Sequence, residues 1–191
     1  MKSKIAIFAS GQGSNFEKIY ENTQNNYLNA EIVLLVVDKE NAKVIERAKK
    51  KNIETLVFNP KKFINKAAYE EIIKEKLLEK EVDLIVLAGY MRLIGKTLLT
   101  AYNNRIINIH PSLLPAFKGK DAIKQAFDYG VKVVGVSIHY VDSSLDGGKI
   151  IAQEAISVNN QDLTTITKEI HQIEYNLYSK TIKKLLEEEI K

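Results

Sequence analysis

The chain has 191 residues, and its 28 lysines and arginines against 24 aspartates and glutamates give a formal net charge of +4. That length and a hydrophobic content of 45% are typical of one globular domain, and they disfavour a disordered, collagen-like or coiled-coil chain. The absence of cysteine excludes disulfides, a thiol nucleophile and thiolate metal sites, and the three histidines leave little material for a metal centre, so we expect no metal.

Four short apolar runs, rich in β-branched residues, alternate with amphipathic segments over the first hundred residues. The apolar runs predict buried strands at residues 4–9, 31–37, 54–58 and 82–88. The segments between them predict helices at about residues 15–25, 42–51 and 66–80. Nearly continuous apolar strands separated by helices are typical of a parallel sheet with both faces covered, so we expect an open α/β unit.

The pattern changes after residue 100. A strand is predicted at residues 105–109, and a short helix at 121–129 that ends at Gly130, a residue favoured as a C-cap. Two β-rich runs at 131–141 and 149–158 are joined by a segment too short for a helical crossover, which predicts an antiparallel pair. A long helix follows at 163–188. We therefore expect one domain over residues 1–191, a three-layer α/β fold whose sheet is mostly parallel with an antiparallel C-terminal part.

The loop at residues 11–15 (GQGSN) follows the first predicted strand, and ligands of open α/β sheets bind outside the carboxyl ends of strands. Its glycines let the backbone approach a ligand, and the N–H groups that begin the next helix attract phosphate. Phe16 stands where a dinucleotide fingerprint has its third glycine, and no Gly-Lys-Ser/Thr follows, which excludes a nucleoside-triphosphate loop. Phosphate binding and a plain turn with Ser14 or Asn15 as N-cap both remain open.

Other loops carry side chains suited to acid–base chemistry. Arg92 follows the fourth strand and, taken alone, is either a site residue or a surface arginine beside the core. Asn108 and His110 stand two residues apart, so a strand turns both toward one cavity, where an amide donor and a proton carrier suit a developing oxyanion. A hydrogen-bonded histidine at a strand end is the alternative. In isolation, Asp146 is typical of a local backbone cap, and His139 of a structural histidine.

Four motifs occur in order along the chain: SGQGSN at residues 10–15, LAGYMR at 87–92, NIHPSLLP at 108–115, and the segment 136–148 that ends in LDGG. In letters and spacing they closely resemble the phosphoribosylglycinamide (GAR) formyltransferase family of de novo purine synthesis, over nearly the whole chain. The resemblance implies a Rossmann-like formyltransferase fold, with a nucleotide-binding half at residues 1–100 and a folate-binding, catalytic half at 101–191. It also implies direct formyl transfer from 10-formyltetrahydrofolate to the GAR amine through a tetrahedral intermediate, with these two small molecules as partners.

The same resemblance assigns roles to individual residues. It implies that His110 transfers a proton, that Asn108 supports the oxyanion and contacts the folate, and that Asp146 holds the histidine. The GAR side comprises Gly13, Ser14 and Asn15 at the phosphate and Glu174 at the ribose. The folate side comprises Met91, Arg92, Leu93, Ile94, Val141 and Asp142, together with Lys66, where relatives often carry an arginine.

The chain departs from the family pattern at several positions on the substrate side. These positions are Lys118, Asp121, Lys149, His171, Tyr175 and Ser179. None of them belongs to the set formed by Asn108, His110 and Asp146, so the expected chemistry stands while the substrate contacts at these positions stay open.

Three other functions compete with this one. A hydrolase of the same folate shares the three residues but usually carries an additional N-terminal domain, and a methionyl-tRNA formyltransferase adds a C-terminal domain for which 191 residues leave no room. A non-catalytic binding module is disfavoured by the intact Asn108, His110 and Asp146. The expected protein is therefore a GAR formyltransferase, as a monomer or a homodimer.

Charge and hydropathy bear on the remaining partners and on location. The charge excess is small and only Arg47, Arg92 and Arg105 are arginine, whereas recognition of nucleic acid favours arginine, so we expect no nucleic-acid partner. No apolar stretch approaches the roughly 18 residues of a membrane span, and the N-terminal apolar run is too short for a signal sequence. The expected location is the cytoplasm, with no membrane partner.

Overall fold

A computed structural model describes residues 2–159 and 161–188, and the remaining residues of the predicted domain (1, 160 and 189–191) lie outside the described part. One seven-stranded sheet forms the centre, in the order β3-β2-β1-β4-β5-β6-β7. The first five strands are parallel, whereas β6 pairs antiparallel with β5 and β7 antiparallel with β6. The strands are β1 (Ser3–Ala9), β2 (Ala30–Val37), β3 (Thr55–Val57), β4 (Leu84–Leu87), β5 (Ile106–His110), β6 (Val133–Tyr140) and β7 (Ile150–Ser157).

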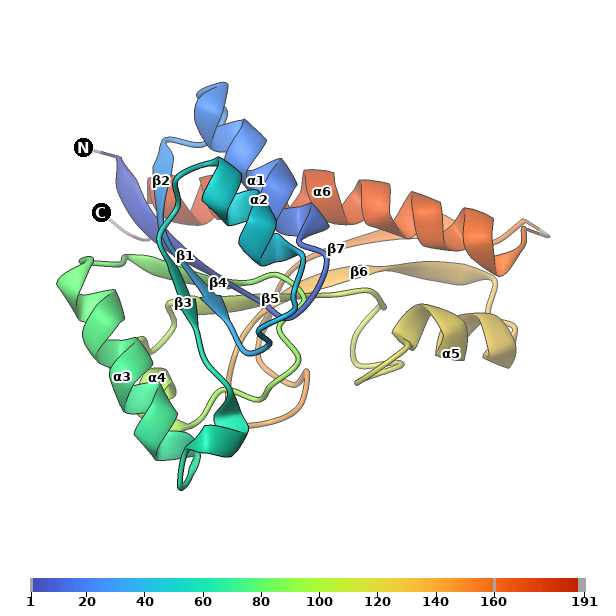
Figure 1. Ribbon diagram of the computed structural model, residues 1–191. Coiled ribbons are helices and arrows are strands. Elements are labelled where there is room, and N and C mark those ends of the chain that lie inside the picture. The colour runs from blue at the N-terminus through green and yellow to red at the C-terminus, as the bar shows by residue number, and fades with distance from the viewer. Residues whose placement is uncertain (1, 160, 189–191) are drawn as a thin grey trace.

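Helices cover both faces of this sheet, which gives three layers (Figure 1). On one face lie α1 (Ser14–Gln24), α2 (Val44–Lys50), α5 (Ala122–Tyr129) and the long α6 (Leu163–Glu188). On the other face lie α3 (Lys66–Glu79) and α4 (Lys96–Ala101). The fold predicted from the sequence is thereby confirmed, including the antiparallel C-terminal part.

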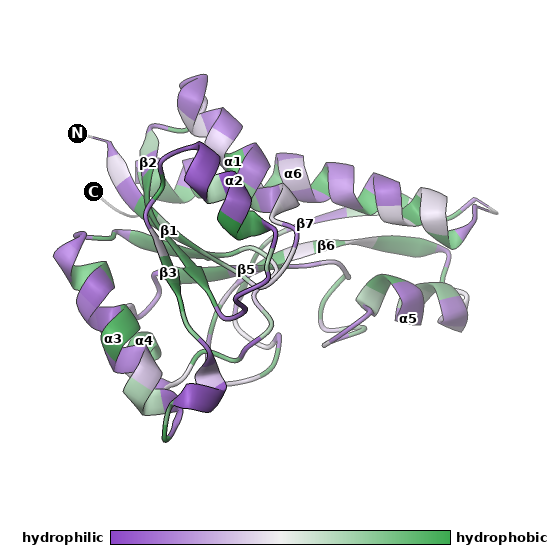
Figure 2. Ribbon diagram, viewed as in Figure 1, coloured by the Kyte–Doolittle hydropathy of each residue, from purple (hydrophilic) through white to green (hydrophobic). Residues whose placement is uncertain are grey.

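The sheet separates two apolar cores, because successive residues of a strand point to opposite faces. In β1, Ile5 and Ile7 pack with α1, α2 and α6, whereas Ala6 and Phe8 pack with α3 and α4. Figure 2 shows the same division, with apolar strands in the middle and hydrophilic stretches on the outer sides of the helices. The nearly unbroken apolar runs of the sequence are thus strands buried on both sides.

All predicted helices and strands are present, and their ends differ from the predicted ones by at most two residues. Gly130 is the C-cap of α5 with φ of 80°, as its position predicted. Two short elements were not predicted, α4 and a 3₁₀ turn at Pro60–Lys62. Six residues are too few for a helical period to stand out, which explains the omission of α4. No helix in residues 2–159 and 161–188 has the length and apolar character needed to cross a membrane.

Tyr178 connects α6 to two central strands, at the carboxyl end of β4 and within β5. Its side chain is fully buried, and its hydroxyl donates a hydrogen bond to the Leu87 carbonyl at 2.8 Å and lies 3.2 Å from the Ile107 carbonyl. These carbonyls directly precede the loop after β4 and the polar residue Asn108 of β5. The helix therefore helps to fix β4 and β5, the two strands that lead into the candidate site.

Replacement of Tyr178 by Phe tests this connection. Because the variant leaves buried carbonyl groups with one donor fewer, we expect the free energy of unfolding to fall by about 1–2 kcal/mol with an unchanged urea m-value. The matched control is Tyr129→Phe, since Tyr129 is 80% exposed. A Tyr178→Phe variant no less stable than this control would show that the hydroxyl does not hold β4 and β5.

Candidate active site

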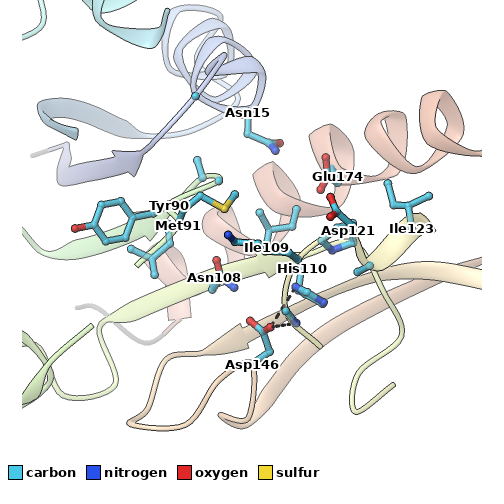
Figure 3. A pocket seen from close by; sticks show the side chains of 18 of the residues that line it. Asn15, Tyr90, Met91, Asn108, Ile109, His110, Asp121, Ile123, Asp146 and Glu174 are labelled. Atoms are coloured by element: carbon cyan, nitrogen blue, oxygen red, sulfur yellow. Dashed lines mark hydrogen bonds and ion pairs between the residues drawn. The ribbon is translucent and has the colours of Figure 1, made fainter. Parts of the chain in front are cut away.

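A cavity of about 840 Å³ lies at the carboxyl ends of the central parallel strands. Residues 11–15 after β1, 87–94 after β4 and 108–111 at the end of β5 line it, as do residues of the loop before α5, the joint between β6 and β7, and α6. Figure 3 shows Asn15 and Glu174 extending from their helices, with Asn108, His110 and Asp146 on the opposite side. This is the place where open α/β sheets bind ligands.

Asn108 and His110 face this cavity because of the alternation in β5. Ile107 and Ile109 belong to the core beneath α1 and α6, so the two polar residues point the other way. The His110 side chain is only 7% exposed, and its Nε2 lies 2.9 Å from the Phe117 carbonyl oxygen. A carbonyl only accepts, so Nε2 donates a proton there, and Nδ1 lies 3.6 Å from Asp146 Oδ2.

Asp146 approaches His110 from the joint between β6 and β7. Its φ of 47° is in the left-handed region, which aspartate tolerates better than most residues. Its Oδ2 accepts a hydrogen bond at 2.8 Å from the N–H of Gly119, 27 residues away. Asp146 therefore bridges two loops instead of capping its own, and the structure brings it together with His110 and Asn108 as expected.

Asp142, expected beside the folate, does not line the cavity. It is exposed, and Oδ1 accepts hydrogen bonds from the N–H and the hydroxyl of Ser144 at 2.8 and 2.6 Å. These hydrogen bonds hold the pKa of Asp142 below its usual value. The local turn of this loop is thus made by Asp142, which leaves the carboxylate of Asp146 for His110. Val141, its neighbour, does line the cavity.

The loop at residues 11–15 is built around Gly13. This residue is the N-cap of α1 with φ of 76°, and a Cβ there would stand 2.5 Å from Val44 Cγ2, so only glycine fits. Neither Ser14 nor Asn15 is the cap, contrary to the alternative of a plain capped turn. Asn15 is buried, yet its Oδ1 has no hydrogen-bond partner among the described residues, and Figure 3 shows the side chain directed at the cavity.

The loop after β4 forms another wall, and its residues 91–94 line the cavity. Met91 and Leu93 are 59% and 47% exposed, which leaves apolar surface open to a ligand. Arg92 also lines the cavity, but its Nε donates to Asp38 Oδ2 at 2.9 Å, an oxygen of a carboxylate that is almost completely buried. The guanidinium therefore anchors the loop to the end of β2.

Two side chains of α3 hold the same loop from outside. Lys66, expected at the folate, does not line the cavity; its Nζ donates to the Leu93 carbonyl at 3.0 Å. Glu70 accepts a hydrogen bond from the Gly95 N–H at 2.6 Å, and burial raises the pKa of this carboxyl. The ammonium group of Lys66 thus lies at the rim, bound to the backbone of the loop.

On α6, Glu174 is 6% exposed and lines the cavity together with His171. Oε2 of Glu174 lies 2.8 Å from Nδ1 of His171, and this hydrogen bond raises the pKa of His171. The His171 ring stacks on Tyr175 with centroids 6.4 Å apart. Ser179 accepts a hydrogen bond from Asn22 of α1 at 2.8 Å and is structural. Two departures from the family pattern, His171 and Tyr175, thus surround Glu174.

His139 is the site residue that the sequence interpretation missed. It is 3% exposed and bonded at both ring nitrogens, as a structural histidine would be, but it also lines the cavity. It stands directly opposite Asn108 in the β5–β6 register, which the sequence did not reveal. The described residues contain no group of three His, Asp or Glu side chains arranged to hold a metal ion.

Comparison with known proteins identifies relatives whose similarity extends over most of the chain. Residues 3–182 match the formyl transferase family. Phosphoribosylglycinamide formyltransferase of Bacillus subtilis is 55% identical over 96% of this chain and 94% of its own length. The Trifunctional purine biosynthetic protein adenosine-3 of Bos taurus is 36% identical over 93% of this chain, which spans only 18% of that protein.

Solved structures show the same similarity. Phosphoribosylglycinamide formyltransferase from Bacillus halodurans superposes with a TM-score of 0.94 at 51% identity, covering 97% of this chain and 96% of the other. Glycinamide ribonucleotide transformylase 1 from Geobacillus kaustophilus also gives a TM-score of 0.94, at 47% identity over 97% of this chain and all of the other.

The pair formed by His171 and Glu174 predicts a pH-dependent contribution to stability. Because the folded pKa of His171 is raised, the pair stabilises the protein fully below about pH 6.5, the ordinary pKa of histidine, and loses this effect as pH rises through the folded pKa. We expect the difference in free energy of unfolding between wild type and His171→Gln to shrink over that range. Urea titrations at a series of pH values measure it, and a difference independent of pH would contradict the pairing.

Proposed function

Because the chain belongs to the formyl transferase family and is a formyl-transferring enzyme of purine biosynthesis, we propose that it moves the formyl group of 10-formyltetrahydrofolate onto the amine of N1-(5-phosphoribosyl)glycinamide. The products are formylglycinamide ribonucleotide and tetrahydrofolate. The observation that carries the proposal is the gathering of Asn108, His110 and Asp146 in one cavity, between a glycine-rich loop and an apolar loop. This arrangement suits a transfer between an anionic nucleotide and a flat, largely apolar donor.

The reaction proceeds by direct attack. The amine nitrogen of GAR bonds to the formyl carbon, and the carbonyl electron pair moves onto oxygen. Asn108 donates an N–H to this oxyanion, and a single such donor typically contributes a factor of about 100 to 1,000 to kcat. When the intermediate collapses, the carbonyl re-forms and the bond to the folate nitrogen breaks.

Protons balance through His110. The attacking amine loses one proton and the departing folate nitrogen gains one. Because Nε2 of His110 already donates to the Phe117 carbonyl, Nδ1 accepts the proton of the amine and delivers it to the folate nitrogen. Asp146, 3.6 Å from Nδ1, orients the ring and stabilises it while it carries the additional positive charge. Both ring nitrogens have an oxygen acceptor beside them, Phe117 O and Asp146 Oδ2, so the doubly protonated ring finds a partner on each side.

The nucleotide lies between the start of α1 and the cavity-facing part of α6. Its phosphate meets the N–H groups at the start of α1, near Gly13 and Ser14, where the helix dipole favours an anion. The unpartnered Oδ1 of Asn15 accepts from a hydroxyl or amide of the substrate. Glu174 accepts from the ribose hydroxyls, and its hydrogen bond with His171 fixes the carboxylate for that role.

The folate lies on the opposite wall. Its pterin packs on residues 91–94 and Val141, where exposed Met91 and Leu93 offer apolar contact. Its glutamate carboxylates reach the rim near Lys66, whose exposed ammonium group provides the opposite charge. Asp142, exposed and bound to Ser144, contributes by holding the shape of its loop.

These placements give each half of the chain contacts with both substrates. The chain forms a single formyltransferase domain in which both substrates touch both halves, since the folate loop at residues 91–94 precedes residue 100 and Glu174 follows it. A role in purine biosynthesis supports a cytoplasmic location.

An assay of formyl transfer with both substrates tests the function directly. We expect tetrahydrofolate to form only when GAR is present, and Asn108→Ala to lower kcat by about 100- to 1,000-fold. The matched control is Asn103→Ala, an exposed position outside the cavity lining, which should retain the wild-type rate. Rapid release of formate that is unaffected by GAR would identify a hydrolase and overturn the proposal.

The phosphate position is tested by Ser14→Asp. A carboxylate placed against a phosphate repels it, so we expect the KM for GAR to rise about tenfold or more while the KM for the folate stays the same. Ser157→Asp makes the same change on the exposed part of β7 and serves as the control. An unchanged KM for GAR in the Ser14 variant would place the phosphate elsewhere.

A further inference from the structure

His139 and Asn108 are neighbours across an antiparallel pair. They stand directly opposite each other on β6 and β5, so their side chains project from the same face of the sheet. Asn108 Nδ2 lies 3.1 Å from His139 Nε2, and the imidazole is almost completely buried. His139 Nε2 also lies 3.9 Å from Asp146 Oδ1. The imidazole therefore touches two of the three residues to which the reaction has been assigned.

The tautomer of His139 follows from its other nitrogen. Nδ1 lies 2.8 Å from the carbonyl oxygen of Tyr140, which can only accept, so Nδ1 carries the proton. In a neutral ring Nε2 is then an acceptor, and it takes an N–H from Asn108. The reversed amide would set its oxygen against the Nε2 lone pair, which is repulsive. The neutral ring therefore selects one orientation of the amide.

We propose that His139 is a positioning residue for formyl transfer: it fixes the Asn108 amide so that the second N–H of Nδ2 remains for the formyl oxygen. The inference rests on the oxyanion role proposed above for Asn108. It extends the catalytic arrangement from three residues to four, with His139 acting through Asn108.

The surroundings keep His139 uncharged. Burial lowers the pKa of His139, and His110 acts in the same direction, against the opposing effects of the Tyr140 carbonyl, Asp146 and Asp142. A second proton would sit on Nε2, where it would meet the Asn108 N–H and draw the Asp146 carboxylate away from His110. A neutral His139 thus protects both the amide orientation and the pair formed by His110 and Asp146.

The carbonyl that sets the tautomer is itself held in place by the joint between β6 and β7. The Tyr140 N–H donates to the Lys149 carbonyl at 2.9 Å, which closes the joint. Gly148 packs so closely that a Cβ there would stand 1.8 Å from the Tyr140 oxygen. The second glycine of the LDGG motif therefore leaves space for the acceptor on which the orientation of His139 depends.

The tautomer can be observed in the wild-type protein without any activity measurement. Long-range ¹H–¹⁵N spectra distinguish a protonated ring nitrogen from an unprotonated one. Near pH 7 we expect His139 to show a protonated Nδ1 and an unprotonated Nε2. A proton on Nε2, alone or together with one on Nδ1, would overturn the proposal.

A double-mutant cycle then tests whether the effect passes through Asn108. In single-turnover assays we expect His139→Leu to lower the transfer rate about tenfold or more, and to do so by less than about twofold in an Asn108→Ala background. His139→Gln, which can supply an acceptor oxygen, should recover most of the rate, and the KM for each substrate should stay near the wild-type value.

The outcomes separate this inference from the proposed function. Equal losses from His139→Leu in both backgrounds would mean that His139 acts through general structure, and would overturn the positioning role alone. A wild-type enzyme without GAR-dependent transfer would overturn the proposed function instead. If the Leu variant does not fold, the tautomer in the wild-type spectrum decides.

Discussion

The carboxylate of Asp146 is the group around which the site is organised. Its side chain is only 10% exposed, and a buried carboxylate needs hydrogen bonds and opposite charge. The protein supplies a hydrogen bond from the N–H of Gly119 at 2.8 Å, and His110, 3.6 Å away, is the imidazole that carries positive charge in the proposed reaction; the uncharged His139 packs beside the carboxylate at 3.9 Å. These partners come from the loop before α5, from β5 and from β6. Satisfying one carboxylate thus brings together segments that lie far apart in the sequence, and it leaves Asn108 and His110 directed at the cavity.

The walls of the cavity depend on contacts of the same long-range kind. Asp38 holds Arg92, and α3 holds the loop after β4 through Lys66 and Glu70. On the nucleotide side, Arg47 of α2 donates to the Gln12 carbonyl at 2.9 Å. Each loop is therefore tied to a helix or a strand end before a substrate arrives, as transition-state stabilisation by fixed donors requires. Some charged residues near the site therefore take part in the reaction, whereas others hold the loops that form its walls.

The sequence was sufficient for the fold because strand runs such as residues 31–37 are almost wholly apolar and are separated by helical periods. It also placed Asn108 and His110 on one face, since a strand turns residues two apart the same way. It could not supply the pairing register between β5 and β6, and without that register His139 is an ordinary buried histidine. Side-chain partners were equally hidden: whether Lys66 faces a ligand or the Leu93 carbonyl depends on how two loops meet in space.

The most direct test of the central claim is the charge of Asp146. Asp146→Asn keeps the size of the side chain and an oxygen to accept from Gly119, but it removes the negative charge beside His110. The rate of formyl transfer should be measured in a single turnover at saturating concentrations of both substrates. The account predicts a loss of about 100-fold or more with substrate binding little changed, because neutralising the carboxylate that orients a catalytic histidine can lower kcat by as much as about 10⁴-fold. A rate within a few-fold of the wild type would contradict it.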